Sequence, residues 1–517
     1  MILESFVSGR WAAGKGDGRA LVNPATGEEI AHASADGIDI VMALDHARNQ
    51  GGTVLRDLSF AQRGDLLKAI AGVLQANRDA YFETARINSG NTAADASIDI
   101  DGGIGTLKYY ARLGSLLGPG KYLIEDGQDQ LARDPVFFSR HLRSARPGVA
   151  VQINAFNFPS WGMWEKIAVA TLAGVPSFSK PATATALLSW QMMRDVIAAG
   201  VVPDGVLSLI CGSGEAIADQ LGPMDSIAFT GSAATGLMFR QMLATRAAAP
   251  RLTVEADSVN STILGRDVTP GSEIFDLAVR EVVKALSVKA GQLCTNIRRI
   301  FVHSSVASAF ADAVAAKVSA LTVGDPASES TGVGPLINRA QRDEALANIA
   351  RLQAESTLIA QARLPAVPEN SGFVAPTLLL CSKPEEACAV HEIEVFGPCA
   401  TILPYERLDQ AAALAIRGEG SLALSLFSDD RDEQLQIVVR LGAWHGRILL
   451  VDSDVGKAHT GHAIVMPQCV HGGPGRAGGG EELGGLRGLS FHMQRTAIQG
   501  STAAFAEIAP DATQIST

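Results

Sequence analysis

The sequence predicts an α/β fold built from parallel sheets. Across residues 148–230, short apolar runs alternate with helical patterns, which is typical of βαβ units that form a dinucleotide-binding sheet. A second alternating series runs from about 274 to 452 and predicts a second α/β domain. With 517 residues the chain is too long for one compact core, so two or three domains are expected.

The first domain is expected to follow a less regular N-terminal part. Residues 1–35 should form short strands and turns, and apolar spacing predicts helices at about 62–88 and 104–117. The polar, loosely alternating segment 126–147 suits an exposed β-hairpin that could pair with a partner subunit. The strands predicted next are 149–153, 175–179, 207–211 and 226–230, with helices at 164–173 and 187–199.

The second domain is expected to carry Cys294. Its clearest predicted strands are 299–302, 397–403 and 447–451. The glycine-dense stretch 472–488 is expected to be a structured loop, and residues 503–517 a frayed tail.

Composition excludes several classes of function. The net charge of −11 argues against general nucleic-acid binding, because a polyanion would be repelled. Neither a membrane span nor a signal pattern is evident in the sequence. The six cysteines have no regular spacing, so we expect a cytoplasmic enzyme with reduced thiols and neither disulfides nor a metal site. The five cysteines other than Cys294 are expected to be small buried hydrophobic residues.

Cys294 and Glu255 are the most informative residues. Cys294 follows a Gly-Gln pair, and Glu255 stands about 40 residues earlier. A thiolate attacks carbonyl groups well, and a carboxylate can then activate the water that releases the acyl group. The two residues therefore predict covalent catalysis by a nucleophile and a base.

Several segments at strand ends suit a bound nucleotide, although each has a simpler reading by itself. The loop at 154–159 could hold an oxyanion or merely cap a helix. Lys180 could bind ribose or phosphate, or be solvated. Ser232, in the small-residue loop 229–236, could meet a pyrophosphate at a helix N-terminus, as could the weaker loop at 211–214, yet glycine-rich turns are common.

Two later segments leave similar alternatives open. Glu394, just before an apolar pair and a turn, could hold both hydroxyls of a ribose or could be a solvated acid at a loop edge. The segment 471–485 is too rich in glycine for an ordinary helix or strand, and it could form a wall of the site or a flexible linker.

In their order and rough spacing these segments resemble the aldehyde dehydrogenase superfamily, over about residues 5–500. The resemblance implies a Rossmann-type cofactor domain, an α/β catalytic domain and a small β oligomerisation hairpin. The segments 153–162, 255–258 and 471–487 are similar to the branch that oxidises CoA-thioester semialdehydes in aerobic phenylacetate (oxepin-CoA) and benzoate degradation. The segment 229–236 favours the phenylacetate side.

The resemblance implies catalytic roles at matching positions. Cys294 would be the nucleophile, and Glu255 the base for hydrolysis of the thioester. The Asn157 amide and the Cys294 backbone N–H would hold the oxyanion. Lys166 and Glu482 match positions that help to relay protons from the base.

It also implies a cofactor site for NADP or NAD. Lys180 and Glu394 would bind the two riboses, and Ser232 the pyrophosphate. The full set of expected cofactor-binding residues is Ile153, Asn154, Ala155, Phe156, Lys180, Pro181, Ala182, Thr183, Gly212, Thr230, Gly231, Ser232, Thr235, Glu255, Ala256, Glu394 and Phe396.

Two departures from common family patterns refine these expectations. Many NAD-preferring relatives have Glu where this chain has Thr183; a carboxylate there would repel a 2′-phosphate, so NADP is favoured. After the base, the sequence at 256–258 is Ala-Asp-Ser in place of Leu-Gly-Gly, which favours the CoA branch over generic aldehydes. Some phenylacetate relatives carry a C-terminal hydratase domain; this sequence shows none, so ring opening is not expected of it.

The expected division is 1–125 with 148–254 for the cofactor, 255–460 for catalysis, and 126–147 with 486–510 for assembly into a homodimer or dimer of dimers. There are three alternatives to this function. An acylating dehydrogenase would pass the acyl group to CoA and generally lacks the base. A cysteine hydrolase would need a histidine beside Cys294, which no local motif supplies. A non-catalytic structural protein is disfavoured because both Cys294 and Glu255 are present.

Overall fold

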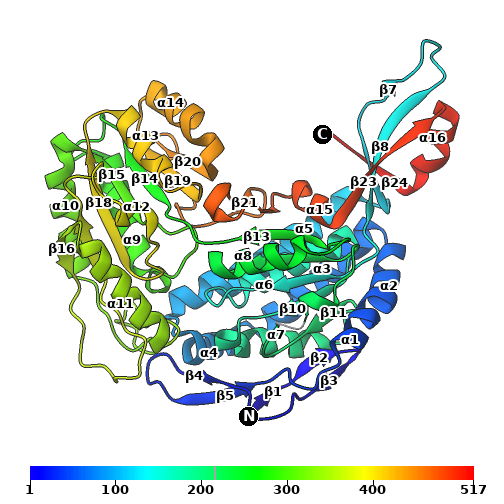
Figure 1. Ribbon diagram of the computed structural model, residues 1–517, viewed down its shortest axis with the longest axis horizontal. Helices are drawn as coiled ribbons and strands as arrows, with labels where there is room; N and C mark the ends of the chain where they lie inside the picture. The colour runs from blue at the N-terminus through cyan, green and yellow to red at the C-terminus, as the bar shows by residue number, and fades with distance from the viewer. Residues whose placement is uncertain (215–216, 517) are drawn as a thin grey trace.

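The first large sheet forms one half of the protein. The computed structural model describes residues 1–214 and 217–516, and in it five parallel strands are extended by an antiparallel pair from the N-terminus (Figure 1). Parallel strands need crossovers, and the helices supply them. The order is β13 (Arg251–Glu255), β12 (Ser226–Thr230), β9 (Ala150–Ile153), β10 (Ser177–Lys180), β11 (Leu207–Leu209), β2 (Ser5–Val7) and β3 (Arg10–Ala12).

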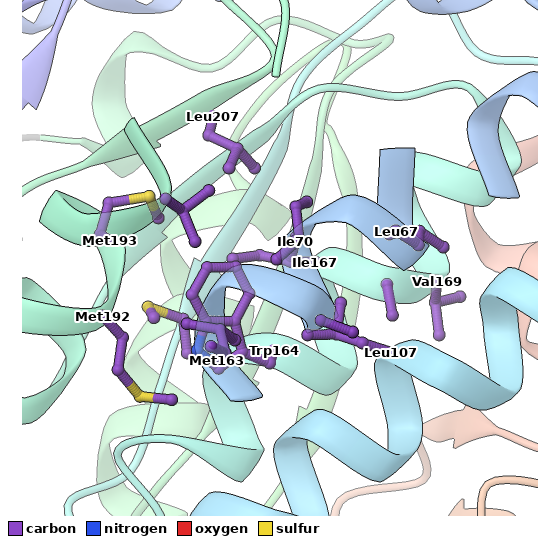
Figure 2. Packing of buried hydrophobic residues seen from close by; sticks show 14 of the residues in the cluster. Leu67, Ile70, Leu107, Met163, Trp164, Ile167, Val169, Met192, Met193 and Leu207 are labelled. Atoms are coloured by element: carbon purple, nitrogen blue, oxygen red, sulfur yellow. The ribbon is translucent and has the colours of Figure 1, made fainter. Parts of the chain in front are cut away.

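Helices cover this sheet and build its core. Trp164 of α6 is fully buried among apolar side chains that include Ile70 of α3 and Leu107 of α5 (Figure 2). Truncating a buried tryptophan to alanine typically costs about 3–5 kcal/mol. The helices of this half are α1 (Ile40–His46), α2 (Gly52–Asp57), α3 (Phe60–Ala76), α4 (Arg78–Ser89), α5 (Ala93–Leu117), α6 (Trp161–Ala173), α7 (Ala186–Ala198) and α8 (Ala233–Ala244).

Two helix predictions needed correction. The periodic run at 62–88 is two helices, because the backbone at Asn77 leaves the helical region (φ −103°, ψ 9°) between α3 and α4. The helix expected at 104–117 begins eleven residues earlier, at Ala93. Its start is fixed by a capping box in which Thr92 and Asp95 bond each other's backbone N–H groups.

The second large sheet forms the other half, on the left of Figure 1. It has six parallel strands and one antiparallel edge strand, as the alternating sequence pattern from 274 onward predicted. The order is β16 (Thr357–Gln361), β17 (Thr377–Leu380), β18 (Cys399–Tyr405), β15 (Arg299–His303), β14 (Ser261–Leu264), β19 (Ser421–Phe427) and β20 (His445–Val451). Its helices are α9 (Glu273–Ser287), α10 (Ser304–Ser319), α11 (Arg339–Gln353), α12 (Ala389–Glu392), α13 (Leu408–Ile416) and α14 (Arg431–Leu441).

A third unit projects from the body at the upper right of Figure 1. Strand β7 (Asp129–Gln130) pairs antiparallel with β8 (Phe138–Ala145), so a hairpin forms in the predicted segment. Residues 503–516 are not a frayed tail: α16 (Thr502–Ile508) leads to β24 (Ala512–Ile515), whose backbone pairs with β6 (Tyr122–Glu125). Thr517, the last residue of the expected tail, lies outside the described residues. Strand β23 (Met493–Gly500) completes this sheet.

Two small sheets remain. Strands β1 (Ile2–Leu3), β5 (Glu29–Ala33) and β4 (Arg19–Val22) form the first. The second is the hairpin of β21 (Val470–Gly472) and β22 (Glu481–Leu483), followed by α15 (Leu486–His492), so the glycine-dense stretch is a structured loop as predicted. None of the helices that the structure describes is long and apolar enough to cross a membrane.

Candidate active site

Cys294 lies in the loop between the second sheet's helix α9 and strand β15, after a strained turn. Lys289 (φ 49°), Ala290 (φ 50°) and Gly291 (φ 73°) are consecutive left-handed residues. Such a conformation costs a non-glycine residue about 1–2 kcal/mol. The Asp95 carboxylate accepts a 2.7 Å hydrogen bond from the Lys289 backbone N–H and holds the turn. Strain of this kind, kept by surrounding contacts, is typical of functional sites.

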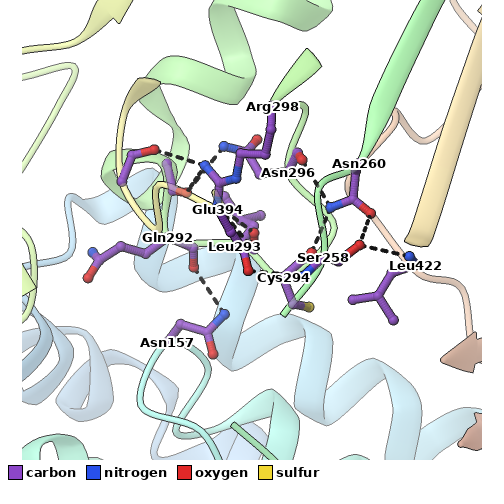
Figure 3. A network of polar contacts seen from close by, with 12 residues as sticks. Asn157, Ser258, Asn260, Gln292, Leu293, Cys294, Asn296, Arg298, Glu394 and Leu422 are labelled. Carbon is purple, nitrogen blue, oxygen red and sulfur yellow. Dashed lines mark hydrogen bonds and ion pairs between the residues drawn. The ribbon is translucent and has the colours of Figure 1, made fainter. Parts of the chain in front are cut away.

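A polar network fixes the loop that carries Cys294 (Figure 3). The Asn260 amide donates to the carbonyl oxygens of Cys294 at 2.8 Å and Asn296 at 3.0 Å. The buried Arg298 guanidinium donates to the carbonyl oxygens of Gly291, Leu293 and Gly397. The position of the thiol is therefore set by buried hydrogen bonds on both sides.

Glu255 is the last residue of β13 and comes from the other large sheet. One carboxylate oxygen, Oε2, lies 2.8 Å from Nε2 of His471, and both side chains are buried. Its other oxygen, Oε1, is buried without a hydrogen-bond partner. A carboxylate oxygen of Glu255, a ring nitrogen of His471 and the sulfur of Cys294 all lie within 4.8 Å of one another. Base and nucleophile, predicted from separate segments, are thus brought together.

The electrostatics of this trio favour a neutral thiol and an ionised carboxylate. Burial raises the pKa of Cys294 well above its ordinary value, and the nearby Glu255 charge raises it further. Burial also raises the pKa of Glu255, but His471 outweighs burial and the pKa falls to about 2. For His471, burial lowers the pKa, and the Glu255 carboxylate more than compensates, so the net shift is upward. The Cys294 thiol consequently needs a nearby acceptor for its proton.

A second charged group lies behind the base. Lys166 of α6 contacts Glu482 of β22 at 2.9 Å and its neighbour Glu165 at 3.7 Å, all with side chains no more than 11% exposed. Burial lowers the pKa of Lys166, but Glu482 and Glu165 raise it overall. Burial raises the pKa of Glu165 to about 7 despite Lys166. The group can therefore hold or pass a proton near neutral pH.

Asn157 stands across the pocket from the base. Its buried amide donates to the Gln292 carbonyl oxygen at 3.0 Å, two residues before Cys294 (Figure 3). A cavity of about 60 Å³ lies among Asn157, Lys166, Glu255, Cys294 and His471. The amide is thus beside the loop that carries the thiol, where it can meet an oxyanion.

Unsatisfied polar atoms mark the carboxyl ends of the first sheet. Both amide atoms of Asn154, which follows β9, and the hydroxyl of Thr230, which ends β12, are buried without partners. Asn154 and Thr230 also line the cavity beside Cys294, as does Ala155. In parallel sheets ligands bind at this edge. These residues fit a dinucleotide whose nicotinamide end reaches the thiol.

The expected sugar-binding residues surround the end of β10. Lys180 ends that strand, next to Pro181 and Ala182, and the Thr183 hydroxyl donates to the Gly212 carbonyl oxygen at 3.2 Å. Burial lowers the pKa of Lys180, and repulsion by Arg19 of β4 lowers it further. Two cations therefore lie near Thr183, which suits an anionic group on the ligand.

Ser232 caps α8, and its hydroxyl accepts a 3.3 Å hydrogen bond from the Thr235 N–H. The preceding Gly231 N–H donates to the Glu255 carbonyl oxygen at 3.1 Å. A Cβ at Gly231 would come within 2.7 Å of the Phe229 ring, so a larger residue here would displace that ring. The helix N-terminus lies next to the strand that ends in the base, which suits a phosphate group.

Glu394 is not a solvated acid. Its Oε2 accepts a 3.0 Å bond from the Ser258 N–H, and its Oε1 lies 3.5 Å from Arg298. Burial raises the pKa of Glu394 to about 7, although Arg298 opposes the shift. Phe396 packs edge to face against Phe156 after β9, with ring centroids 5.5 Å apart, so the two halves meet here.

The sequence did not predict roles at the site for His471, Glu165 and the supporting residues Asn260 and Arg298. No local motif supplies a histidine to Cys294, but β21 brings His471 there from a distant part of the sequence. The signal in the sequence is that His471 begins the glycine-rich segment 471–485. Glu165 could have been noticed as the neighbour of Lys166.

The prediction for the other cysteines was partly wrong. Cys211, Cys381 and Cys399 are buried as expected, whereas Cys388 and Cys469 are exposed. All six are free thiols.

Comparison with known proteins agrees with this geometry. Residues 11–497 match the aldehyde dehydrogenase family. Over 479 residues the chain is 47% identical to a 3,4-dehydroadipyl-CoA semialdehyde dehydrogenase from Aromatoleum evansii, covering 92% of this chain and 93% of that protein. Among solved structures, a putative aldehyde dehydrogenase from Burkholderia cenocepacia superposes with a TM-score of 0.84 at 23% identity, over 96% of this chain and 99% of that one. A betaine aldehyde dehydrogenase from Staphylococcus aureus in complex with NAD+ gives 0.83 at 24% identity, over 97% and 95%.

Proposed function

The chain belongs to the aldehyde dehydrogenase family, and from this premise we propose that it oxidises the aldehyde end of a CoA-thioester semialdehyde to a carboxylate during the breakdown of an aromatic compound of the phenylacetate or benzoate type. NADP is the preferred oxidant. The observation that carries the chemistry is that the Glu255 carboxylate and the Cys294 thiol lie within 4.8 Å of each other, although Glu255 ends β13 of the first large sheet and Cys294 precedes β15 of the second. The 47% identity over 92% of the chain supports the choice of substrate class.

The first half-reaction begins at the thiol. Glu255 accepts the Cys294 proton, and Sγ attacks the aldehyde carbon. The Asn157 amide and the Cys294 N–H stabilise the oxyanion, and one such donor is typically worth about 3 kcal/mol. The hydride acceptor at this point would be supplied by NADP bound at the carboxyl ends of the first sheet. Cys294 is left as a thioester of the substrate.

The second half-reaction is hydrolysis. Glu255 activates a water molecule in the cavity beside Cys294, and the acyl carbon passes from sulfur to oxygen. Lys166 and Glu482 lie behind the base and supply a route by which its proton can leave. Free CoA is not required, because the base is present and water is the acceptor.

The preference for NADP rests on charge around Thr183. Thr183 bears no carboxylate that would repel a 2′-phosphate, and Lys180 with Arg19 places two cations nearby. Lys180 and Glu394 are proposed to hold the two riboses, and Ser232 the pyrophosphate. The NAD+ complex of the staphylococcal relative supports a dinucleotide in this fold.

The CoA-linked substrate is supported by a second cavity. It measures about 280 Å³ and shares Ala463 and Ile464 with the cavity beside Cys294. We propose that a long acyl chain extends from the thiol past these two residues into the second cavity. Small aldehydes would leave this space empty and lose the corresponding apolar contacts.

We propose the expected division of labour as well. Residues 1–125 and 148–254 bind the cofactor, 255–460 carry the catalytic thiol, and 126–147 with 486–510 assemble a homodimer or a dimer of dimers. The projecting sheet supports this division, because β7, β8 and β23 stand clear of the body (Figure 1).

A substrate screen tests the proposal. Free aliphatic semialdehydes and their CoA thioesters are compared under NAD and NADP by following reduced nicotinamide, with and without free CoA. We expect the highest kcat/KM for a CoA thioester with NADP, and a carboxylate product without free CoA. Equal rates for free semialdehydes would contradict the substrate class, and dependence on free CoA would establish an acylating enzyme instead.

A further inference from the structure

The hairpin β21–β22 delivers two ionisable side chains to the active site. His471 and Glu482 are directly opposite each other across its antiparallel strands, and directly paired residues point to one face. His471 reaches Glu255, and Glu482 reaches Lys166. One small element thus contacts both the base and the lysine behind it.

This hairpin is fixed against the strand that carries the base. The Ala256 N–H donates to the Ala477 carbonyl oxygen at 3.0 Å, and the Gly480 N–H donates to the Val254 carbonyl oxygen at 3.2 Å. A side chain at Gly478 would come within 2.0 Å of that same carbonyl oxygen. The glycines therefore permit the close approach that places His471 beside Glu255.

The contact between His471 and Glu255 leaves one carboxylate oxygen free. Oε2 is engaged by Nε2 at 2.8 Å, while Oε1 is buried with no partner, in a pocket that also contains the Cys294 thiol. A base must present an oxygen toward the water that it deprotonates. Oε1 is available for the water, and Oε2 connects it to the histidine.

We propose that His471 is a positioning residue that makes Glu255 one half of a coupled base. It holds the carboxylate beside Cys294 and receives, through Oε2, the proton that Glu255 takes from water during hydrolysis of the thioester. The inference rests on the proposed function, since it concerns the step that releases the acid.

The step balances in atoms and charge. The water oxygen forms a bond to the acyl carbon, the bond from carbon to Sγ breaks, and its electron pair returns to Sγ. One water proton passes to Glu255 and on to Nε2 of a neutral His471 that carries its own ring hydrogen on Nδ1. The other leaves the new carboxylic acid for Sγ, so Cys294 ends as a thiol, the product as a carboxylate and His471 as an imidazolium.

Within the part of the chain that the structure describes, titratable groups from three elements face the pair. Glu165 and Lys166 approach it from α6, Glu482 from β22 and Cys294 from the loop before β15. Burial lowers and Glu255 raises the pKa of His471, which ends above its ordinary value. Below that pKa the histidine is already protonated and cannot take up a second proton. Hydrolysis should therefore accelerate as pH rises through a histidine pKa, not a carboxyl pKa.

The test separates acylation from hydrolysis in His471→Gln, with NADP and hexanal as the probe. Rapid mixing gives the NADPH burst, and the steady state that follows gives hydrolysis, each from pH 5.5 to 9 at two temperatures. Imidazole has a large ionisation enthalpy and a carboxyl group almost none. In the wild type, we expect the midpoint of the hydrolysis profile to fall on warming. In His471→Gln, the burst should persist, hydrolysis at pH 8 should slow about 10- to 100-fold, and the midpoint should no longer move with temperature.

His445→Gln is the matched control, since it removes another buried histidine that bonds the Leu441 carbonyl oxygen; its profile should equal that of the wild type. A wild-type midpoint that does not move with temperature would overturn the inference even if His471→Gln does not fold. An unchanged profile in His471→Gln, or loss of its burst together with its hydrolysis, would overturn it too. Absence of a burst in the wild type with both hexanal and a CoA-thioester semialdehyde would instead count against the proposed function.

Discussion

Two buried carboxylates near Cys294 differ in the partner that each one meets. The side chain of Glu255 is 4% exposed and lies 2.8 Å from His471, whereas that of Glu394 is 8% exposed and lies 3.5 Å from Arg298. Burial raises the pKa of both, yet the net value is about 2 for Glu255 and about 7 for Glu394. Burial alone does not decide the charge of a carboxyl group here. The short contact with His471 keeps the Glu255 carboxyl ionised, while the Glu394 carboxyl stays close to its titration point.

The largest effect is expected from removal of the proposed nucleophile, which should abolish the chemistry beside Glu255. Cys294→Ala is expected to lower kcat by about 10⁴-fold or more, because no covalent intermediate can form. Cofactor affinity, measured by fluorescence titration, should remain within about twofold, since Glu394 is untouched. Residual turnover near the wild-type rate would show that another group attacks the aldehyde.

Loss of the proposed base should separate the first half-reaction from hydrolysis of the thioester. Glu255→Gln is expected to slow steady turnover by about 10²- to 10⁴-fold, because hydrolysis loses its general base. A single burst of NADPH per site should survive but form more slowly, because the Cys294 thiol has lost its proton acceptor and only its small thiolate fraction can attack. Stopped-flow absorbance measures both quantities. Normal steady turnover would mean that Glu255 is not the base.

A negative charge at position 183 should change the preference between NADP and NAD and leave the reaction beside Glu255 unchanged. Thr183→Glu is expected to raise KM for NADP by about 10- to 100-fold, because the new carboxylate repels a 2′-phosphate. KM for NAD should change far less, and the hydrolysis rate should be unaffected. Thr183→Val is the control, since it removes the hydroxyl without adding charge. An equal rise for both cofactors would remove the basis for the NADP preference.

The smallest effect should be a pH response at Glu394. With a pKa of about 7, this carboxyl is mostly neutral at pH 6 and mostly ionised at pH 8. The ionised form accepts ribose hydrogen bonds better, so the Kd for NADP should fall about threefold between these values. Glu394→Gln should abolish the trend. Calorimetric titration checks it, and a Kd that rises with pH would reverse the assigned role.

Local pattern was sufficient for most of the fold. The apolar run at 226–230 is strand β12, and the run at 299–302 is β15 with one more residue, because buried parallel strands show as continuous apolar segments. The break at Asn77 escaped notice, since apolar spacing continues across it. The tail at 503–516 was misjudged because its order depends on β24 pairing with β6, almost 400 residues away.

The sequence by itself determined the α/β class and pointed to the proposed nucleophile, the proposed base and the strand ends where a dinucleotide can bind, because periodicity and short motifs are local properties of the chain. Only the tertiary structure decided what surrounds those groups. His471 and Glu255 become neighbours through the packing of a glycine-rich hairpin on β13, and Glu394 meets Arg298 through a loop between strands of the other sheet. The ionisation of a buried carboxyl depends on such partners at about 3 Å, and no sequence spacing specifies them.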